Sequence, residues 1–363
     1  MERLRTFGEV YDNRNNAFDI LRFILASMVI YSHSYPLLYG TAHGGDILER
    51  ITGFQVSFGS LAVCGFMVIS GFLITQSYFC SHTLKRYVVS RCLRVLPAFA
   101  ASLLLTAFLI GPWLSGMDWN AYLFSGGAEN PGKFVLLNLS FNVFGYSWGV
   151  QDVFAANPFP GSANGSMWTL KHEIAMYLLL PLCAYFLFFQ RRYFALFFGM
   201  VFLGLAWLNV YDAQNFSPQG RLWWVLKEYN SFIKLASFFW LGAIGYIFRD
   251  KIIHSWRLVL LAVLVLIFAN SLHLVKYAMF ICLPYLLLAV AVGCQASWIR
   301  KYGDFSYGIY IYAFPVQQTL IALFKTELTV GTFCLSAFVV TVACAAISWH
   351  VLEKPALNLK NRF

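Results

Sequence analysis

The chain has 363 residues, of which 60% are hydrophobic and only 12% are charged, and its mean hydropathy is +0.65. This balance excludes a water-soluble globular protein and predicts an all-α integral membrane protein. The formal net charge of +10 comes from lysines and arginines that gather in every second connection between apolar runs. That pattern indicates membrane orientation and gives no evidence of nucleic-acid binding.

Apolar runs of about twenty residues, the length that crosses roughly 30 Å of hydrocarbon, recur along the chain. They lie at 17–38, 56–79, 95–114, 133–150, 168–189, 193–211, 231–248, 256–272, 275–294, 305–324 and 330–352. The run 133–150 is the weakest because it is interrupted by lysine, asparagine, glycine and serine, so we interpret it as a loop or re-entrant segment. The remainder predicts a bundle of about ten transmembrane helices with both termini in the cytoplasm.

We expect the whole chain, 1–363, to form one transmembrane domain. Its one extended connection, 115–167, is predicted to be an extracytoplasmic loop or re-entrant segment, and loops of this length are usually lids or binding segments. The eight cysteines are scattered without a paired spacing, so neither a disulfide framework nor a metal site is indicated.

The first run contains the ionisable residues Arg22 and His33, which are eleven positions apart. Eleven positions of an α-helix return to nearly the same face, so both side chains project from one stripe about 16 Å apart along the axis. Ionisable groups inside a membrane are costly and usually functional. Asp19 falls on nearly the same face and is expected to pair with Arg22. A neutral imidazole is the commonest general base at neutral pH, and the alternative is a histidine that only touches the membrane interface.

A second group of candidates lies in the run 56–79 and just after it. Arg91 and Arg94 are one helical turn apart and form a fork suited to a polyphosphate, with Arg86 just before them. Arginines at the cytoplasmic face also serve only to set orientation or to bind lipid head groups. Ser70 lies between two glycines, which either allow close helix packing or leave room for a pantetheine arm.

Glu173 occurs in the run GSMWTLKHEIAMYLLLP, where a helix enters from the predicted extracytoplasmic side. A carboxylate at this place could orient or balance the charge of His33. The alternative is an acidic residue that only stabilises the helix N-terminus through the helix dipole.

Several runs together resemble the acyltransferase-3 family of membrane O-acyltransferases. FDILRFILASMVIYSHS resembles that family's first helix, GFMVISGFLIT its second and RCLRVLPAF its arginine pair. MWTLKHEIAMYLLLP resembles its tryptophan-to-glutamate segment, GDFSYGIYIYAFPVQQ its penultimate helix and VLEKP its C-terminal signature. The order and spacing of these runs cover nearly the whole chain. One departure is Ala313, where many relatives carry a histidine.

The resemblance implies a stand-alone multi-pass enzyme of the bacterial inner membrane, with an acyl-CoA donor on the cytoplasmic side and transfer, most often of acetyl, to a sugar hydroxyl. The acceptor would be a cell-surface polysaccharide or a lipid-linked glycan. Carried over residue by residue, His33 is the catalytic base with Arg22 as its partner and Glu173 as the supporting carboxylate. Arg91 and Arg94 contact the donor phosphates, and Arg86 and Ser70 are further donor-binding candidates.

Two rival functions remain open from the sequence. A secondary transporter or glycan flippase would also line its route with buried charges, but such proteins commonly contain inverted repeats and paired broken helices, which we do not detect. A membrane scaffold or receptor would explain the aromatic loop 115–167 but not Arg22. The acceptor sugar, the length of the acyl group, the use of a covalent acyl-enzyme and the oligomeric state are not determined by the sequence.

Overall fold

A computed structural model describes residues 5–40, 44–81, 83–124, 130–141, 146–186, 196–197, 199–201, 203–205, 221–324 and 329–362. Within these ranges the regular secondary structure is helical, without a strand, and the only bridge between extended residues joins Thr6 to Ile253. The prediction of an all-α membrane protein is confirmed. The predicted span 193–211 lies mostly outside the described residues.

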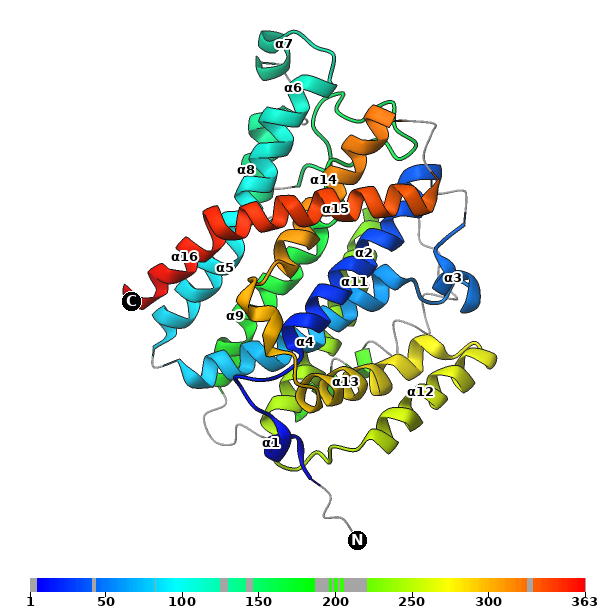
Figure 1. Cartoon of the computed structure of the whole chain (residues 1–363), viewed down its shortest axis with the longest axis vertical. Helices are drawn as coiled ribbons and strands as arrows, with labels where there is room; N and C mark the ends of the chain where they lie inside the picture. Colours follow the sequence, from blue (N-terminus) through cyan, green and yellow to red (C-terminus); the bar gives the residue numbers. More distant parts are fainter. Residues whose placement is uncertain are drawn as a thin grey trace.

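Nine long helices make up the bundle in Figure 1: α2 (Phe18–Tyr39), α4 (Phe58–Cys80), α5 (Leu84–Leu104), α9 (Leu170–Phe186), α11 (Arg221–Ile247), α12 (Trp256–Ser271), α13 (Val275–Gly293), α14 (Ser306–Phe324) and α15 (Val330–Ser348), counted among the described residues. Short helices and turns join or extend them: α1 (Phe7–Val10), α3 (Ile47–Ile51), η1 (Leu105–Ile110), α6 (Gly111–Leu114), α7 (Trp119–Phe124), α8 (Pro131–Leu139), η2 (Met167–Thr169), η3 (Ser297–Lys301), η4 (Trp349–Glu353), α16 (Lys354–Asn358) and η5 (Leu359–Arg362).

The predicted count of about ten membrane spans is not confirmed. In the described ranges, four continuous helical stretches are long and apolar enough to cross a membrane: Phe58–Cys80, Leu84–Leu114, Val275–Gly293 and Val330–Asn358. Other helices are of similar length but carry polar side chains toward the interior of the bundle. Charges or amides on a helix lower its mean hydropathy even when neighbouring helices cover them.

Helix α14 shows this effect most clearly. It packs against α2 and α15, and Figure 1 shows α15 crossing in front of both. Fourteen of its nineteen residues are buried, among them Gln317 and Gln318. Gln317 donates to the carbonyl of Ile30 on α2 at 2.9 Å and to Ser34 Oγ at 3.0 Å. A helix covered on every side can therefore carry amides, because its neighbours satisfy them.

Helices α4 and α11 form the most extensive helix pair in the described structure. Gly71 on α4 lies against the carbonyl of Phe239, and Gly242 on α11 lies against the carbonyl of Val68. A Cβ atom at either glycine would overlap the opposing backbone oxygen. The two small residues thus allow the backbones to touch, which is the usual role of glycine at helix crossings in membranes.

Helix α5 begins earlier than the sequence predicted. The sequence placed the apolar run at 95–114, but the helix starts at Leu84, where the Thr83 side chain accepts from the backbone N–H of Arg86 and caps it. The helix then continues through η1 and α6 to Leu114. The basic residues therefore lie on the helix itself, which carries Arg91 and Arg94 into the bundle.

The long connection 115–167 contains α7 and α8, and α8 has nine residues, too few to cross a membrane. Its later part is held against α14. Asn157 donates to the carbonyl of Gln318 at 2.9 Å, and Asn164 donates to the carbonyl of Ile311 at 2.9 Å. Both asparagines are buried, so this part of the loop is packed on the bundle and helps to position α9.

Candidate active site

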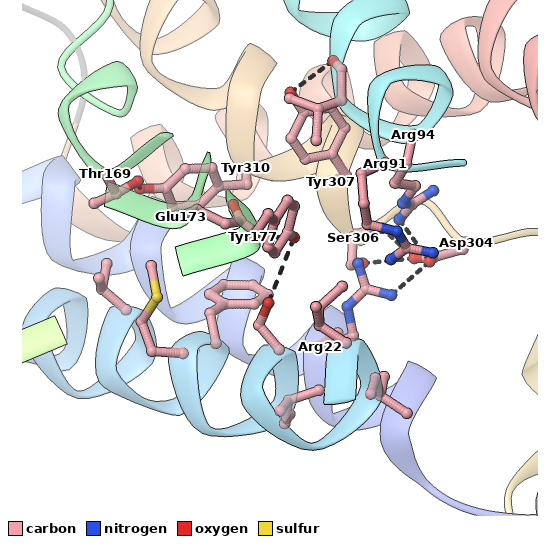
Figure 2. A pocket seen from close by; sticks show the side chains of 18 of the residues that line it. Arg22, Arg91, Arg94, Thr169, Glu173, Tyr177, Asp304, Ser306, Tyr307 and Tyr310 are labelled. Carbon is pink, nitrogen blue, oxygen red and sulfur yellow. Dashed lines mark hydrogen bonds and ion pairs between the residues drawn. The ribbon is translucent and has the colours of Figure 1, made fainter. Parts of the chain in front are cut away.

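A cavity of about 260 Å³ opens between α2, α4, α5, α9 and the start of α14. Figure 2 shows its polar side chains in two groups, with guanidinium groups on one side and tyrosines with a carboxylate on the other. Of the residues selected from the sequence, five line this cavity: Arg22, Ser70, Arg91, Arg94 and Glu173.

Asp304 joins two of the arginines. Its Oδ2 atom lies 2.7 Å from Arg22 Nη1 and 2.6 Å from Arg94 Nη2. Its Oδ1 atom accepts from the Ser306 hydroxyl at 2.5 Å and from the Ser306 backbone N–H at 3.3 Å. Burial alone would raise the pKa of this carboxyl, but the two guanidinium groups overcome burial and hold it well below its usual range.

The predicted pairing of Asp19 with Arg22 is wrong. Asp19 Oδ2 accepts from Arg300 Nε at 2.6 Å, and Arg300 also donates to the carbonyls of Asn13 and Arg14. Helical spacing identifies neighbours on the same helix, whereas Arg300 comes from η3, which packs against α2. Arg22 therefore pairs with Asp304, which lies in the connection between η3 and α14.

A second carboxylate, that of Glu353, lies close to Arg94. Glu353 has no exposed side-chain surface, its Oε2 lies 3.6 Å from Arg94 Nη1, and its Oε1 accepts from Ser348 Oγ at 3.0 Å. The guanidinium of Arg94 also lies over the rings of Tyr307 and Trp349, at 5.7 and 5.8 Å from their centroids. Arg94 is thus enclosed by two carboxylates and two aromatic faces, which fix its position.

Arg91 is bound differently. Counting only the described residues, it makes one hydrogen bond, from Nη2 to Ser77 Oγ at 3.4 Å, and its Nε is buried without a partner among them. No carboxylate of the described residues lies within ion-pair distance of it. Arg91 is therefore the guanidinium in this cavity whose charge is left for a bound anion. Arg86 is exposed at the start of α5 and does not line the cavity.

On the opposite side, Glu173 and Tyr177 lie one turn apart on α9. The Tyr177 hydroxyl donates to Glu173 Oε1 and accepts from Ser70 Oγ at 3.4 Å. The sequence predicted that Glu173 orients His33. In the part of the chain that the structure describes, the carboxylate instead binds Tyr177 and lines a cavity that His33 does not reach.

His33 lines a second cavity, of about 290 Å³, enclosed by α2, α4 and α11 with Trp168 and Tyr310. The His33 ring lies edge-on to Phe314 with centroids 5.3 Å apart, and its Nδ1 is buried without a hydrogen-bond partner. The residues that line this second cavity are Val29, Ser32, His33, Ser57, Gly59, Ser60, Val63, Cys64, Trp168, Ser231, Lys234, Leu235 and Tyr310.

The two cavities, which we call the arginine cavity and the histidine cavity, share two lining residues, Val63 and Tyr310. The Tyr310 hydroxyl is bonded to Thr169 Oγ1 at 2.7 Å and donates to the carbonyl of Ser166 at 3.1 Å. Helix α2 therefore contributes Arg22 to one cavity and His33 to the other. The helical spacing predicted one stripe for both side chains, and it did not predict that they line two different cavities.

Sequence reasoning missed Asp304, Glu353, Tyr177 and Lys234. Asp304 and Glu353 lie in the runs GDFSYG and VLEKP, which resemble family signatures but whose carboxylates had no predicted role. Both are carboxylates next to an apolar run, and this is the signal that could have singled them out. Among the described residues, no group of three or more histidine, cysteine or acidic side chains is arranged to hold a metal ion.

Comparison with known proteins shows the family of the chain. The chain is 29% identical to Nodulation protein 10 of Rhizobium leguminosarum bv. viciae, in an alignment that covers 96% of this chain and 94% of that protein. It is 25% identical to the O-acetyl transferase of Shigella phage Sf6, covering 95% of this chain and 97% of that protein. No solved structure matches the chain. A family model described as an acyltransferase domain matches residues 15–349, so the chain belongs to the acyltransferase-3 family.

Proposed function

We propose that this membrane O-acyltransferase moves an acetyl group from cytoplasmic acyl-CoA to a hydroxyl of a cell-surface polysaccharide or lipid-linked glycan in the bacterial inner membrane. The observation that carries the proposal is the arrangement of the two cavities. One gathers three guanidinium groups, the other contains an imidazole, and a single helix contributes to both. The name of the phage relative supports acetyl as the transferred group.

The arginine cavity suits the phosphates of the donor. Guanidinium groups bind phosphate oxygens through paired N–H donors, and Arg91 has no carboxylate partner among the described residues. Arg22 and Arg94 share the Asp304 carboxylate, and Arg94 also faces Glu353, so we assign these two arginines mainly to shaping the cavity. A donor held in this way keeps its charged nucleotide at the arginines while the thin acyl-pantetheine arm extends toward His33.

The histidine cavity suits the transfer itself. In this proposal the acceptor hydroxyl attacks the thioester carbonyl, and His33 removes the hydroxyl proton as the new C–O bond forms. The tetrahedral intermediate then collapses, the C–S bond breaks, and the imidazolium returns the proton to the leaving thiolate. The carbonyl must pass Val63 and Tyr310, which line both cavities.

Purified protein in lipid vesicles, labelled acetyl-CoA and the glycan fraction of the source cells test the proposal. We expect label in the glycan and release of free CoA, and a transporter or flippase would leave the thioester intact. His33→Gln should reduce transfer by about 10² to 10⁴, the usual contribution of a general base. His350→Gln changes an exposed histidine and serves as the matched control. Full activity of His33→Gln would refute the role of His33.

A further inference from the structure

A lysine lines the histidine cavity together with His33. Lys234 lies on α11, and its Nζ donates to Ser60 Oγ on α4 at 2.7 Å. It comes from a different helix than His33, which lies on α2. The cavity has a volume of about 290 Å³, and Trp168, Ser60 and Tyr310 are among its other polar and aromatic lining residues.

The close crossing of α4 and α11 explains how Lys234 reaches this place. The glycines Gly71 and Gly242 let the two backbones touch further along the same pair of helices. Lys234 lies eight residues, a little over two turns, before Gly242 on α11. Its side chain reaches α4, where Ser60 accepts its hydrogen bond.

Lys234 has no carboxylate within ion-pair distance in the part of the chain that the structure describes, and Ser60 is its one hydrogen-bond acceptor there. An ammonium group has three N–H donors, so donors remain for a group that enters the cavity. A cation without a counter-ion inside a helix bundle is costly. Such a cation is best explained by a negative charge that forms in the cavity during the reaction.

We propose that Lys234 is a further catalytic residue, whose ammonium group stabilises the oxyanion of the tetrahedral intermediate. This inference rests on the proposed function. As the acceptor oxygen bonds to the thioester carbon, the C=O π electrons move to the carbonyl oxygen, and Lys234 donates a hydrogen bond to that oxyanion while His33 holds the proton taken from the hydroxyl. When the C=O bond re-forms, the C–S bond breaks and the thiolate takes the proton from His33.

Two alternative roles for Lys234 predict different behaviour. If the lysine binds an anionic group of the acceptor, its loss raises the KM for the acceptor and leaves kcat nearly unchanged. If it only fastens α11 to α4 through Ser60, then removing either partner lowers thermal stability by the same amount. An oxyanion contact is made in the transition state, so its loss lowers kcat without weakening substrate binding.

The test uses membranes of the source organism that lack the native gene and carry each variant, so the natural acceptor is present. Labelled acetyl-CoA and added extracted glycan acceptor are each titrated in turn, so that kcat and both KM values are measured, and label in the glycan is counted. Lys234→Met keeps the length of the side chain and removes the charge, and we expect kcat to fall about 10² to 10³-fold, the usual effect of losing one oxyanion donor. The KM for acetyl-CoA should change less than threefold.

Three further variants complete the design. Lys234→Arg keeps the charge and should retain more activity than Lys234→Met. Ser60→Ala removes the partner, and its kcat should stay well above that of Lys234→Met. Lys251→Met makes the same change at an exposed lysine and should behave as the wild type. Melting temperatures of the purified proteins show whether each variant is folded.

The outcomes distinguish failure of the transferase from failure of the lysine's role. If the wild type transfers no label, the proposed function fails. If the wild type is active and folded Lys234→Met has an unchanged kcat, or if only its KM changes, the oxyanion role is overturned while the transferase stands. Equal loss of activity and of melting temperature in Lys234→Met and Ser60→Ala would assign the lysine to helix packing and also overturn it.

Discussion

Arg22 and Asp304 lie 282 positions apart in the sequence and 2.7 Å apart in space. The pair joins α2 to the connection before α14. Arg94 of α5 contacts the same carboxylate, with its Nη2 atom 2.6 Å from Asp304 Oδ2. Three segments that are distant along the chain are thus held at one carboxylate. The arginine cavity owes its shape to this contact.

Asp304→Asn removes the charge that two guanidinium groups share. The side chains of Asp304 and Arg22 are only 21% and 20% exposed, so we expect a loss of about 2 kcal/mol in the free energy of unfolding. Unfolding in mixed detergent micelles measures it. The control is Asp19→Asn, whose partner Arg300 is 38% exposed, and it should cost less than about 1 kcal/mol. Equal losses would show that Asp304 has no special role.

The pH dependence of stability follows from the same carboxyl. Its pKa is lowered in the folded protein because Arg22 and Arg94 outweigh the effect of burial. A lowered pKa contributes stability that is fully present above the unfolded value, about 3.9, and is lost as the pH falls below it. The melting temperatures of wild type and Asp304→Asn should therefore differ by a constant amount from about pH 5 to 8, within the usual working range, and converge below about pH 4. A gap that persists unchanged in acid would contradict this assignment.

Arg91→Gln should weaken donor binding more than Arg86→Gln. Arg91 lines the arginine cavity without a carboxylate partner in the described structure, whereas Arg86 is exposed outside it. Losing one charge-assisted hydrogen bond to phosphate should raise the KM for acetyl-CoA about 10- to 100-fold. Initial rates at varied acetyl-CoA measure it. A large effect of Arg86→Gln would mean that the donor extends beyond this cavity.

Glu173→Gln and Tyr177→Phe should have similar effects, because the Tyr177 hydroxyl donates to the Glu173 carboxylate. We expect each to raise the KM for acetyl-CoA by about tenfold and to leave the pH profile of kcat unchanged. Tyr122→Phe is the control, since its hydroxyl bonds the carbonyl of Ala107 away from both cavities. A shifted pH profile in Glu173→Gln alone would instead support the sequence-based role of Glu173 in orienting His33.

Gly242→Ala should disturb the crossing of α4 and α11. The added Cβ would overlap the carbonyl oxygen of Val68, which is backbone and cannot rotate away. We expect a loss of stability of about 1 to 3 kcal/mol from overpacking, together with reduced transfer because Lys234 moves with α11. Gly331→Ala, with open space around its Cβ, should be neutral or slightly stabilising. Thermal unfolding of both variants in the same detergent distinguishes these outcomes.

The sequence predicted the local relationships well. Arg22 and His33 both lie on α2, and Arg91 and Arg94 both lie on α5, as their spacing predicted. The three arginines line the arginine cavity, and His33 lines the histidine cavity. These relationships depend on helix geometry alone, which is the same in every helix. The overall class followed from composition for a similar reason, because only helices and closed barrels satisfy their backbone in lipid.

Partners across the bundle could not be predicted in this way. Asp19 is three positions from Arg22 and was the natural candidate by helix periodicity, yet it pairs with Arg300 and leaves Arg22 to Asp304. Which carboxylate meets which arginine is decided by how α2, α5 and α14 pack. The predicted number of membrane spans is not confirmed for a related reason, because a helix such as α14 is covered by its neighbours and need not be apolar.

Tyr310 lines both cavities, and its position affects the access of water more than the binding of substrate. Val63 is the other residue that lines both, and the Tyr310 hydroxyl is held by Thr169 and Ser166. A group that passes between the two cavities at this place meets an aromatic ring with two anchors. Under the proposed function, this ring would limit contact between a thioester in the arginine cavity and water in the histidine cavity, and so would protect the activated acyl group from hydrolysis.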